Sequence, residues 1–163
     1  MTIVACIESG LLEPLTIRMV ECLRRFGGRF ANLEVVAVTP RATPPLAGET
    51  HRRMSELNIR HLRIHPKNPY IWHHYMNKAE AIAAVEEQVT TEAIAWIDSD
   101  IIFMREPNDL ELSPGVDFLA SAPDAGVIGR LARSDLGLPA VGYGCKMKIP
   151  RLEDLARQPA DHS

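Results

Sequence analysis

The stretch EAIAWIDSDIIFMR, Glu92 to Arg105, decides the fold. An apolar run, Ala93 to Ile97, leads directly into Asp98-Ser99-Asp100, and a second apolar run, Ile101 to Met104, follows. A short, continuous apolar run is typical of a strand that is buried on both faces, as in a parallel sheet. We therefore expect a central strand that ends at two carboxylates.

The two carboxylates predict a cation site. In an extended backbone, residues i and i+2 point to the same side, about 6.6 Å apart. At an effective dielectric of about 20, ionised Asp98 and Asp100 would then repel each other by roughly 2.8 kcal/mol. A divalent cation would remove this repulsion, and oxygen ligands suit magnesium or manganese. The alternative is that one Asp caps a turn and the other is solvated.

Length and composition indicate one globular domain. The chain has 163 residues, of which we assign 1–150 to a single α/β domain and 151–163 to a polar tail. With 46% hydrophobic and 24% charged residues, disorder is not expected. A net charge of −3 gives no reason to expect nucleic acid or an anionic membrane surface as a partner. No apolar run approaches the roughly 20 residues that span a bilayer, and the N-terminal MTIVACIESG is typical of a strand rather than of a signal peptide.

The three cysteines, Cys6, Cys22 and Cys145, are widely spaced and form no metal-binding pair. Cys6 and Cys22 lie within apolar patterns, which favours buried free thiols in a reducing compartment. The sequence therefore predicts a cytoplasmic protein.

The first forty residues have the pattern of a β-α-β unit. Ile3 to Ile7 is a short apolar strand, and Pro14 suits the first turn of the helix that follows. Apolar residues recur at helical spacing until Gly27-Gly28 stops the helix; they are Leu15, Met19, Cys22, Leu23 and Phe26. Leu33 to Val38 is a second buried strand, and a right-handed crossover is expected.

The sequence patterns of the remaining elements are weaker. Glu49 to Leu57 predicts a short helix, and Ile59, Leu62 and Ile64 predict a third, less buried strand. After the acidic motif, we expect Arg105-Glu106-Pro107 to break the strand. Further expected elements are an excursion at Asn108–Leu112, a turn at Ser113-Pro114-Gly115, a strand at Val116–Ala120, a short helix at Val127–Leu136 and a loop at Gly142-Tyr143-Gly144.

The segment PKNPYIWHHYM, Pro66 to Met76, is dense in aromatic and imidazole groups. Such a loop either shapes a pocket or plugs the core, and the sequence leaves both open. Neighbouring residues of an extended chain point to opposite faces, so His73 and His74 do not predict a zinc site. His61 and His65 are expected to be solvated residues at a strand edge.

Asn77 to Val89 is the clearest helix. Asn77 is a good N-cap, Glu80 follows three residues later, and the stripe expected to face inward is Ala81, Ile82, Val85 and Val89. Lys78 is unusual, because a cation in the first turn opposes the helix dipole. A phosphate sharing the site would explain it; a solvent-exposed lysine whose cost is tolerated is the alternative.

Together these residues resemble the GT-A-type glycosyltransferases. In that family an Asp-x-Asp motif ends a central strand, and an Asn-Lys pair often opens the helix before it. Asn77-Lys78, a helix and Asp98-Ser99-Asp100 follow the same order here, and the resemblance covers Thr2 to about Gly126, the donor-binding half. It implies a three-layer α/β/α sandwich with a mostly parallel, Rossmann-like sheet.

The resemblance also implies an activity. A Mn²⁺ or Mg²⁺ ion would bridge the two phosphates of a nucleoside diphosphate sugar, whose sugar passes to an unknown acceptor. Asp100 would ligate the metal, Asp98 would meet the ribose or a metal-bound water, and Ser99 would line the donor pocket. Lys78 would neutralise phosphate charge and Asn77 would orient the same corner.

Further site residues follow from the strand ends. Ligands of such sheets bind beyond the carboxyl ends of the strands, so the residues expected to flank base and ribose are Ile7, Glu8, Ser9, Thr39, Pro40 and Arg41. Asp124 is the downstream acid on a loop and is assigned as the catalytic residue. A homo-oligomer is expected if an acceptor half is missing, because an apolar patch near Val127 to Tyr143 would then need covering.

Three other functions fit less well. A non-catalytic module that binds nucleotide sugars would share every donor residue. A phosphotransferase with an aspartyl nucleophile normally carries its Asp-x-Asp after the first strand. A nucleotidyltransferase typically carries a glycine-rich stretch there, which ESGLLEP does not supply.

Overall fold

The computed structural model describes residues 1–65, 76–113, 116, 118–120 and 144–147. Several predictions fall outside this part: most of the aromatic segment, the helix at 127–136, the tail at 151–163 and Asp124. Within it, no helix has both the length and the apolar character needed to cross a membrane.

A six-stranded sheet with the order β3-β2-β1-β4-β6-β5 forms the centre of the molecule. Its strands are β1 Thr2–Cys6, β2 Glu34–Thr39, β3 Ile59–Arg63, β4 Ile94–Ile97, β5 Phe118–Ala120 and β6 Gly144–Met147. β3, β2, β1 and β4 pair in parallel, whereas β6 pairs antiparallel with both β4 and β5. The mostly parallel sheet is confirmed.

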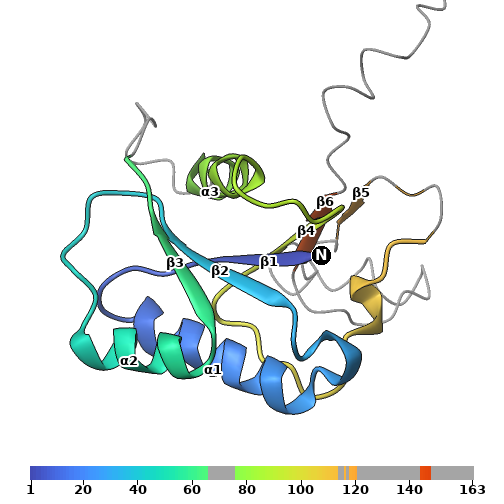
Figure 1. The fold of residues 1–163 in the computed structure, drawn as a ribbon, viewed down its shortest axis with the longest axis horizontal. Helices are drawn as coiled ribbons and strands as arrows, with labels where there is room; N and C mark the ends of the chain where they lie inside the picture. Colours follow the sequence, from blue (N-terminus) through green and yellow to red (C-terminus); the bar gives the residue numbers. More distant parts are fainter. Residues whose placement is uncertain (66–75, 114–115, 117, 121–143, 148–163) are drawn as a thin grey trace, which may run out of the picture.

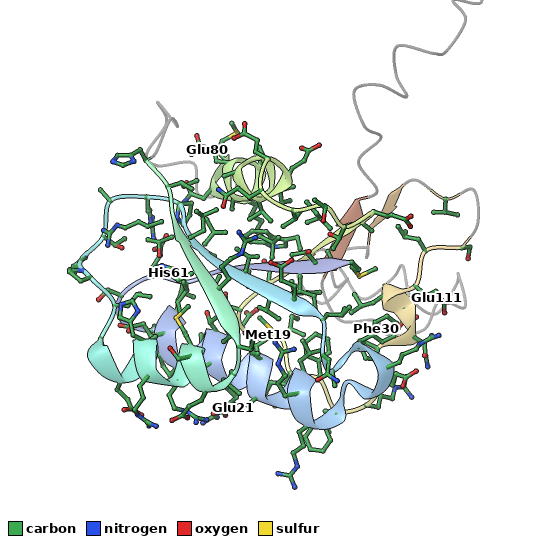
Figure 2. The ribbon with its side chains drawn as sticks, in the orientation of Figure 1. Met19, Glu21, Phe30, His61, Glu80 and Glu111 are labelled. Atoms are coloured by element: carbon green, nitrogen blue, oxygen red, sulfur yellow. The ribbon has the colours of Figure 1, made fainter. Side chains whose placement is uncertain are left out.

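Helices cover both faces of the sheet, as Figure 1 shows: α3 lies on one side, and α1 and α2 lie on the other. The bounds are α1 Leu12–Phe26, α2 Gly48–Glu56 and α3 Met76–Glu86, with short 3₁₀ turns η1 Gly28–Phe30 and η2 Asn108–Leu110. In Figure 2, Met19 on α1 and Glu80 on α3 mark the two helical layers. The three-layer α/β/α prediction is confirmed.

Alternate residues of each central strand supply the two halves of the core, because side chains alternate across a strand. In β4, Ala95 and Ile97 pack on the α1 and α2 side, while Ile94 and Trp96 pack on the α3 side. All four are buried, as the apolar run predicted. β3 is less buried, in agreement with its weaker pattern.

Some predicted details were wrong. The second apolar run is not a strand: Ile102 and Met104 are 57% and 83% exposed, and only Phe103 of the run is buried. Gly144, predicted as loop, begins β6, whose pairing with β4 crosses about fifty residues of sequence. Phe26, predicted to face the core, is 41% exposed because α1 ends there, and the Arg25 guanidinium lies over its ring.

The start of α3 also differs from the prediction. Met76 already belongs to the helix, so Asn77 lies within α3 instead of capping it. Its inward stripe is as expected: Ala81 and Val85 are buried, and Ile82 and Val89 pack partly buried against the same cluster.

An ionic bracket joins η1 to the segment that follows the acidic motif. The Arg29 guanidinium donates to Asn108 Oδ1 at 3.1 Å and to Glu111 Oε2 at 2.7 Å, and it lies 3.1 Å from Glu106 Oε1. Gly28 has φ +53°, and a Cβ there would lie 1.9 Å from Glu106 Oε2, so the bracket needs glycine at this position. Figure 2 shows Phe30 of η1 and Glu111 at the same end of the molecule.

Candidate functional site

The acidic motif forms a turn at the carboxyl end of β4. β4 ends at Ile97, and the backbone N–H of Ile101 donates to the carbonyl of Asp98 at 3.1 Å. The prediction of an extended backbone, with both carboxylates on one side, was therefore wrong. Asp98 is half-buried, whereas Asp100 is exposed. We call Asp98–Ile101 the acid turn.

Ser99 fixes the acid turn to the neighbouring strand. Its side chain is buried, and its hydroxyl donates to the carbonyl of Cys6 at the end of β1. The Thr16 hydroxyl of α1 also lies 3.0 Å from this carbonyl. The Ser99 hydrogen bond thus fixes the acid turn to the end of β1, and the Thr16 hydroxyl lies between this carbonyl and that of Leu12, at 2.7 Å.

Asp98 is held by two donors at one oxygen. Its Oδ1 accepts a hydrogen bond from Trp96 Nε1 at 2.7 Å and from Lys78 Nζ at 2.6 Å. The Lys78 ammonium also lies 5.6 Å from the centre of the Trp96 ring, within range of a cation–π interaction. Lys78 thus sits between the carboxylate and the indole at the start of α3.

A second ion pair lies at the ends of β1 and β2. Glu8 is buried, and its two carboxylate oxygens accept from Nε and NH2 of Arg41, the first at 2.7 Å. These hydrogen bonds raise the pKa of the Arg41 guanidinium. Burial, together with the charge of Glu8, raises the pKa of the neighbouring Cys6 thiol to about 12, so Cys6 remains protonated at neutral pH.

These groups surround one pocket of about 420 Å³, within the size range of small-molecule sites. The lining includes three leucines as well as both ion pairs and Asp100. The lining residues are Cys6, Glu8, Leu11, Leu12, Leu15, Arg41, Asn77, Lys78, Trp96, Asp98, Ser99 and Asp100.

Glu13 supports the rim of the pocket from behind. Its buried carboxylate accepts from the backbone N–H of Gly10 at 3.0 Å, from that of Ala47 at 2.8 Å and from the Thr50 hydroxyl. Burial favours the neutral acid, but the hydrogen bonds from Thr50, Gly10 and Ala47 outweigh it and lower the pKa of Glu13. We call this group the Glu13 cradle; it ties the loop before α1 to the start of α2.

Of the predicted site residues that the structure describes, seven meet at the pocket and four do not: Ile7, Ser9, Thr39 and Pro40, the last of which is buried. Glu8, Arg41, Asn77, Lys78, Asp98, Ser99 and Asp100 line it. Ile7 is fully buried in the core, and Ser9 is half-buried outside the lining. Thr39 is buried too: its hydroxyl donates to the Ile7 carbonyl at 2.8 Å and lies 2.9 Å from His61 Nε2.

Sequence reasoning missed the apolar part of the lining. Leu11, Leu12 and Leu15 come from the start of α1, and Leu11 is 76% exposed at the rim. Trp96 was assigned to the core, yet its indole N–H is directed to Asp98. The available signal was a tryptophan two residues before an acid in a strand, a spacing that places both on one face.

The residues fit a hard divalent cation only in part. Asp98 and Asp100 supply carboxylate oxygens, the ligand type that Mg²⁺ and Mn²⁺ prefer. No group of three or more such ligands occurs among the residues that the structure describes. Two carboxylates are enough where a phosphate substrate completes the coordination shell, as is usual for Mg²⁺.

The mostly parallel sheet with helices on both faces has the architecture of the GT-A-type glycosyltransferases. The sequence comparison then names the family: residues 3–127 match the model of the Rhodobacterales glycosyltransferase domain, and the chain belongs to this family. No curated protein matches the sequence significantly.

Solved structures agree on the fold. The mannosyltransferase PcManGT from Pyrobaculum calidifontis, in complex with GDP-Man and Mn²⁺, is similar with a TM-score of 0.58 at 18% identity, covering 98% of this chain and 47% of that one. The galactosyltransferase LgtC, in complex with donor and acceptor sugar analogues, has a TM-score of 0.60 at 13% identity, covering 98% and 60%. The chain thus spans about half of one and three fifths of the other.

Proposed function

We propose that this chain binds a nucleoside diphosphate sugar together with Mn²⁺ or Mg²⁺ and transfers the sugar to an acceptor. The supporting observation is the convergence of the acid turn, Lys78 and the Glu8–Arg41 pair on one pocket. These groups come from four separate segments of the chain, and a purely structural role for each would not require them to share a cavity.

The two kinds of lining suggest how the donor lies. A nucleobase has apolar faces, so the wall formed by Leu11, Leu12 and Leu15 suits the base. The diphosphate carries the negative charge, so it belongs beside Lys78 and Asn77 at the first turn of α3, where the helix dipole also favours an anion. Arg41, positioned by Glu8, lies where it can donate to the base or the ribose.

The acid turn would hold the cation. Asp100, which is exposed at the pocket, is the direct ligand in this proposal, and Asp98 meets the ribose or a water on the cation. The bound cation would stabilise the negative charge that develops on the departing diphosphate. Ser99 keeps the turn in place through the Cys6 carbonyl.

The acceptor side is argued from sequence alone. Asp124, on the loop predicted after the strand at 116–120, is our candidate for the catalytic acid or base. A cytoplasmic location and self-association around residues 127–143 remain predictions of the sequence.

A module that binds the donor without transferring its sugar is the second candidate. Every described residue that lines the pocket lies between Cys6 and Asp100, a range that includes all the donor-binding residues of this proposal. Both candidates require donor binding, and only the first requires turnover.

Calorimetric titration with UDP, GDP, ADP and CDP, each with and without Mn²⁺, tests the binding step. We expect one diphosphate to bind in a Mn²⁺-dependent manner; no binding by any of them contradicts both candidates. The sugar forms of the nucleotide that binds are then incubated with protein and Mn²⁺, and the release of nucleoside diphosphate is measured. Binding without release or transfer identifies the non-catalytic module.

A further inference from the structure

The Lys78–Asp98 ion pair occupies part of the place where a cation would bind. One oxygen of Asp98 already accepts from both Lys78 and Trp96, so its charge is largely neutralised by the protein itself. Asp100 is then the carboxylate of the acid turn that remains exposed to a cation. A divalent ion that reaches the acid turn alone meets little net negative charge and a neighbouring ammonium.

We propose that Lys78 makes the acid turn select a cation–diphosphate complex and reject the free divalent cation. This inference rests on the proposed function and names the form in which the ligand is accepted. A diphosphate carries enough negative charge to attract both Lys78 and the divalent ion, so Lys78 moves from Asp98 to a phosphate oxygen as the complex enters. Asp98, still held by Trp96 but no longer by Lys78, then becomes available to the ion or to a water on it.

The surroundings of Lys78 suit such a movement. Its side chain is 38% exposed and that of Asp98 is 32% exposed, so neither charge would be left in a dry interior when the pair separates. Trp96, by contrast, is buried, and its N–H continues to hold Asp98 after Lys78 leaves. Trp96 is thus a positioning residue that keeps the carboxylate at the pocket in both states.

The two ligands should therefore be thermodynamically coupled, and the coupling should depend on the charge of residue 78. Typical coupling between two sites corresponds to about 5–150-fold in affinity and is reciprocal. In Lys78→Met, the free cation should bind more tightly than in the wild type, while the diphosphate should lose much of its cation-independent affinity.

Binding of Mn²⁺ alone is measured through the electron paramagnetic resonance signal of the free ion, which is lost on binding. We expect Lys78→Met to bind Mn²⁺ about tenfold more tightly than the wild type. Lys78→Arg, which retains the charge, should bind it as weakly as the wild type. Arg25→Met is the control for net charge, because Arg25 is exposed at the opposite end of α1 from the pocket; its affinity should be unchanged.

Equal Mn²⁺ affinity in Lys78→Met and the wild type overturns the inference, and so does a gain in Lys78→Arg that matches the gain in Lys78→Met. Thermal melts confirm that each variant is folded, and Lys78→Gln replaces Lys78→Met if the latter is not. This test contains no nucleotide. Failure of the inference therefore leaves the proposed function standing, whereas the absence of nucleotide binding in the titrations above removes the proposed function.

A second measurement follows Lys78 directly in the wild-type site. The chain has two tryptophans, Trp72 and Trp96, so Trp72→Phe leaves Trp96 as the sole emitter. Mg²⁺ alone should leave the emission of Trp96 unchanged, and Mg²⁺ with pyrophosphate should shift it, because the ammonium leaves its position 5.6 Å from the ring. A shift with Mg²⁺ alone equal to the shift with both would contradict selection of the complex.

Discussion

The Glu13 cradle and the acid turn show two uses of carboxylates around one pocket. Glu13 is buried, and its oxygens accept from two backbone N–H groups and one hydroxyl. Asp100 is exposed, and Asp98 shares one oxygen between Lys78 and Trp96. A carboxylate surrounded by buried donors stabilises loops, whereas one that is exposed, or is paired with a partly exposed ammonium, can accept a ligand.

The contrast predicts that variants in the two places fail in different ways. Asp100→Ala should lose Mn²⁺-dependent affinity for the nucleotide by on the order of 100-fold or more, because a direct ligand matters at least as much as an outer-shell group. Its melting temperature should be that of the wild type, because Asp100 is exposed. Calorimetry measures the affinity for the nucleotide, and thermal melts measure the melting temperature. Asp109→Ala, an exposed acid in η2 outside the pocket, is the matched control; an equal loss in that variant would refute the assignment of Asp100.

Glu13→Ala should show the opposite pattern. Removing the carboxylate leaves buried donors at Gly10, Ala47 and Thr50 without their acceptor, which costs about 2 kcal/mol. For a chain of this size the melting temperature should fall by roughly 4–8 °C. Denaturant unfolding measures the loss in unfolding free energy, and Glu87→Ala, which removes an exposed carboxylate just after α3, supplies the comparison. An unchanged midpoint for Glu13→Ala would mean that the cradle contributes nothing to stability.

Lys78→Ala tests the side of the acid turn that faces the phosphates. We expect about a tenfold loss in affinity for the nucleoside diphosphate, the scale of one charge-assisted hydrogen bond. The affinity of the free nucleoside should change much less, because it carries no phosphate. Titrations of wild type and variant with both ligands give the loss of affinity for each. Equal losses of affinity for the nucleoside diphosphate and the free nucleoside would place Lys78 away from the diphosphate.

The lowered pKa of Glu13 predicts a smaller effect, a pH-dependent difference in unfolding free energy between wild type and Glu13→Gln. Its folded-state pKa is lowered, so its contribution to stability is present above the ordinary value near 4.5 and is lost as the pH falls through the folded-state pKa. The difference in unfolding free energy between wild type and Glu13→Gln should therefore be largest near pH 7 and narrow below about pH 4.5. Denaturant unfolding at several pH values measures it. A difference that stays constant from pH 7 to pH 3 would show that ionisation of Glu13 is irrelevant.

The thiol of Cys6 provides the mildest test. Because its pKa is raised to about 12, alkylation by iodoacetamide at pH 7.5 should be slow. Glu8→Gln removes a charge that raises this pKa, so the rate at Cys6 should increase severalfold, with Cys22 as the internal reference. Mass spectrometry of the labelled peptides resolves the two sites. A slower rate in Glu8→Gln would mean that the released Arg41 side chain covers the thiol.

The predictable part of the fold is the part with local patterns. β1, α1, β2, α2, β3 and β4 begin and end within two residues of the predicted bounds, since apolar runs and helical periodicity are visible in short windows. β6 was missed because Gly144–Met147 has no alternating pattern, and its strand character comes from pairing with β4. The exposure of Phe26 was not predicted. Helical spacing placed this residue on the inward face of α1, but spacing does not show where the helix extends beyond the sheet.

The site was predictable in its residue types and less so in its geometry. Asp98, Asp100 and Lys78 were identified from an acid pair after an apolar run and from a cation at a helix start. The direct Lys78–Asp98 contact joins residues twenty positions apart on different elements, and no local pattern reports it. The turn that separates the two Asp side chains depends on the hydroxyl of Ser99 reaching β1, which is likewise non-local.

The antiparallel strand β6 has a consequence for synthesis of the protein on the ribosome. The described lining of the pocket lies within residues 6–100, whereas the strand that pairs with the outer edge of β4 begins only at Gly144. While the intervening segment is being translated, the backbone of Ile94–Ile97 has an unpaired edge, which is prone to pair with other chains. The nascent chain should therefore be most vulnerable to aggregation in this interval, and a stop codon placed just after residue 100 should yield insoluble protein.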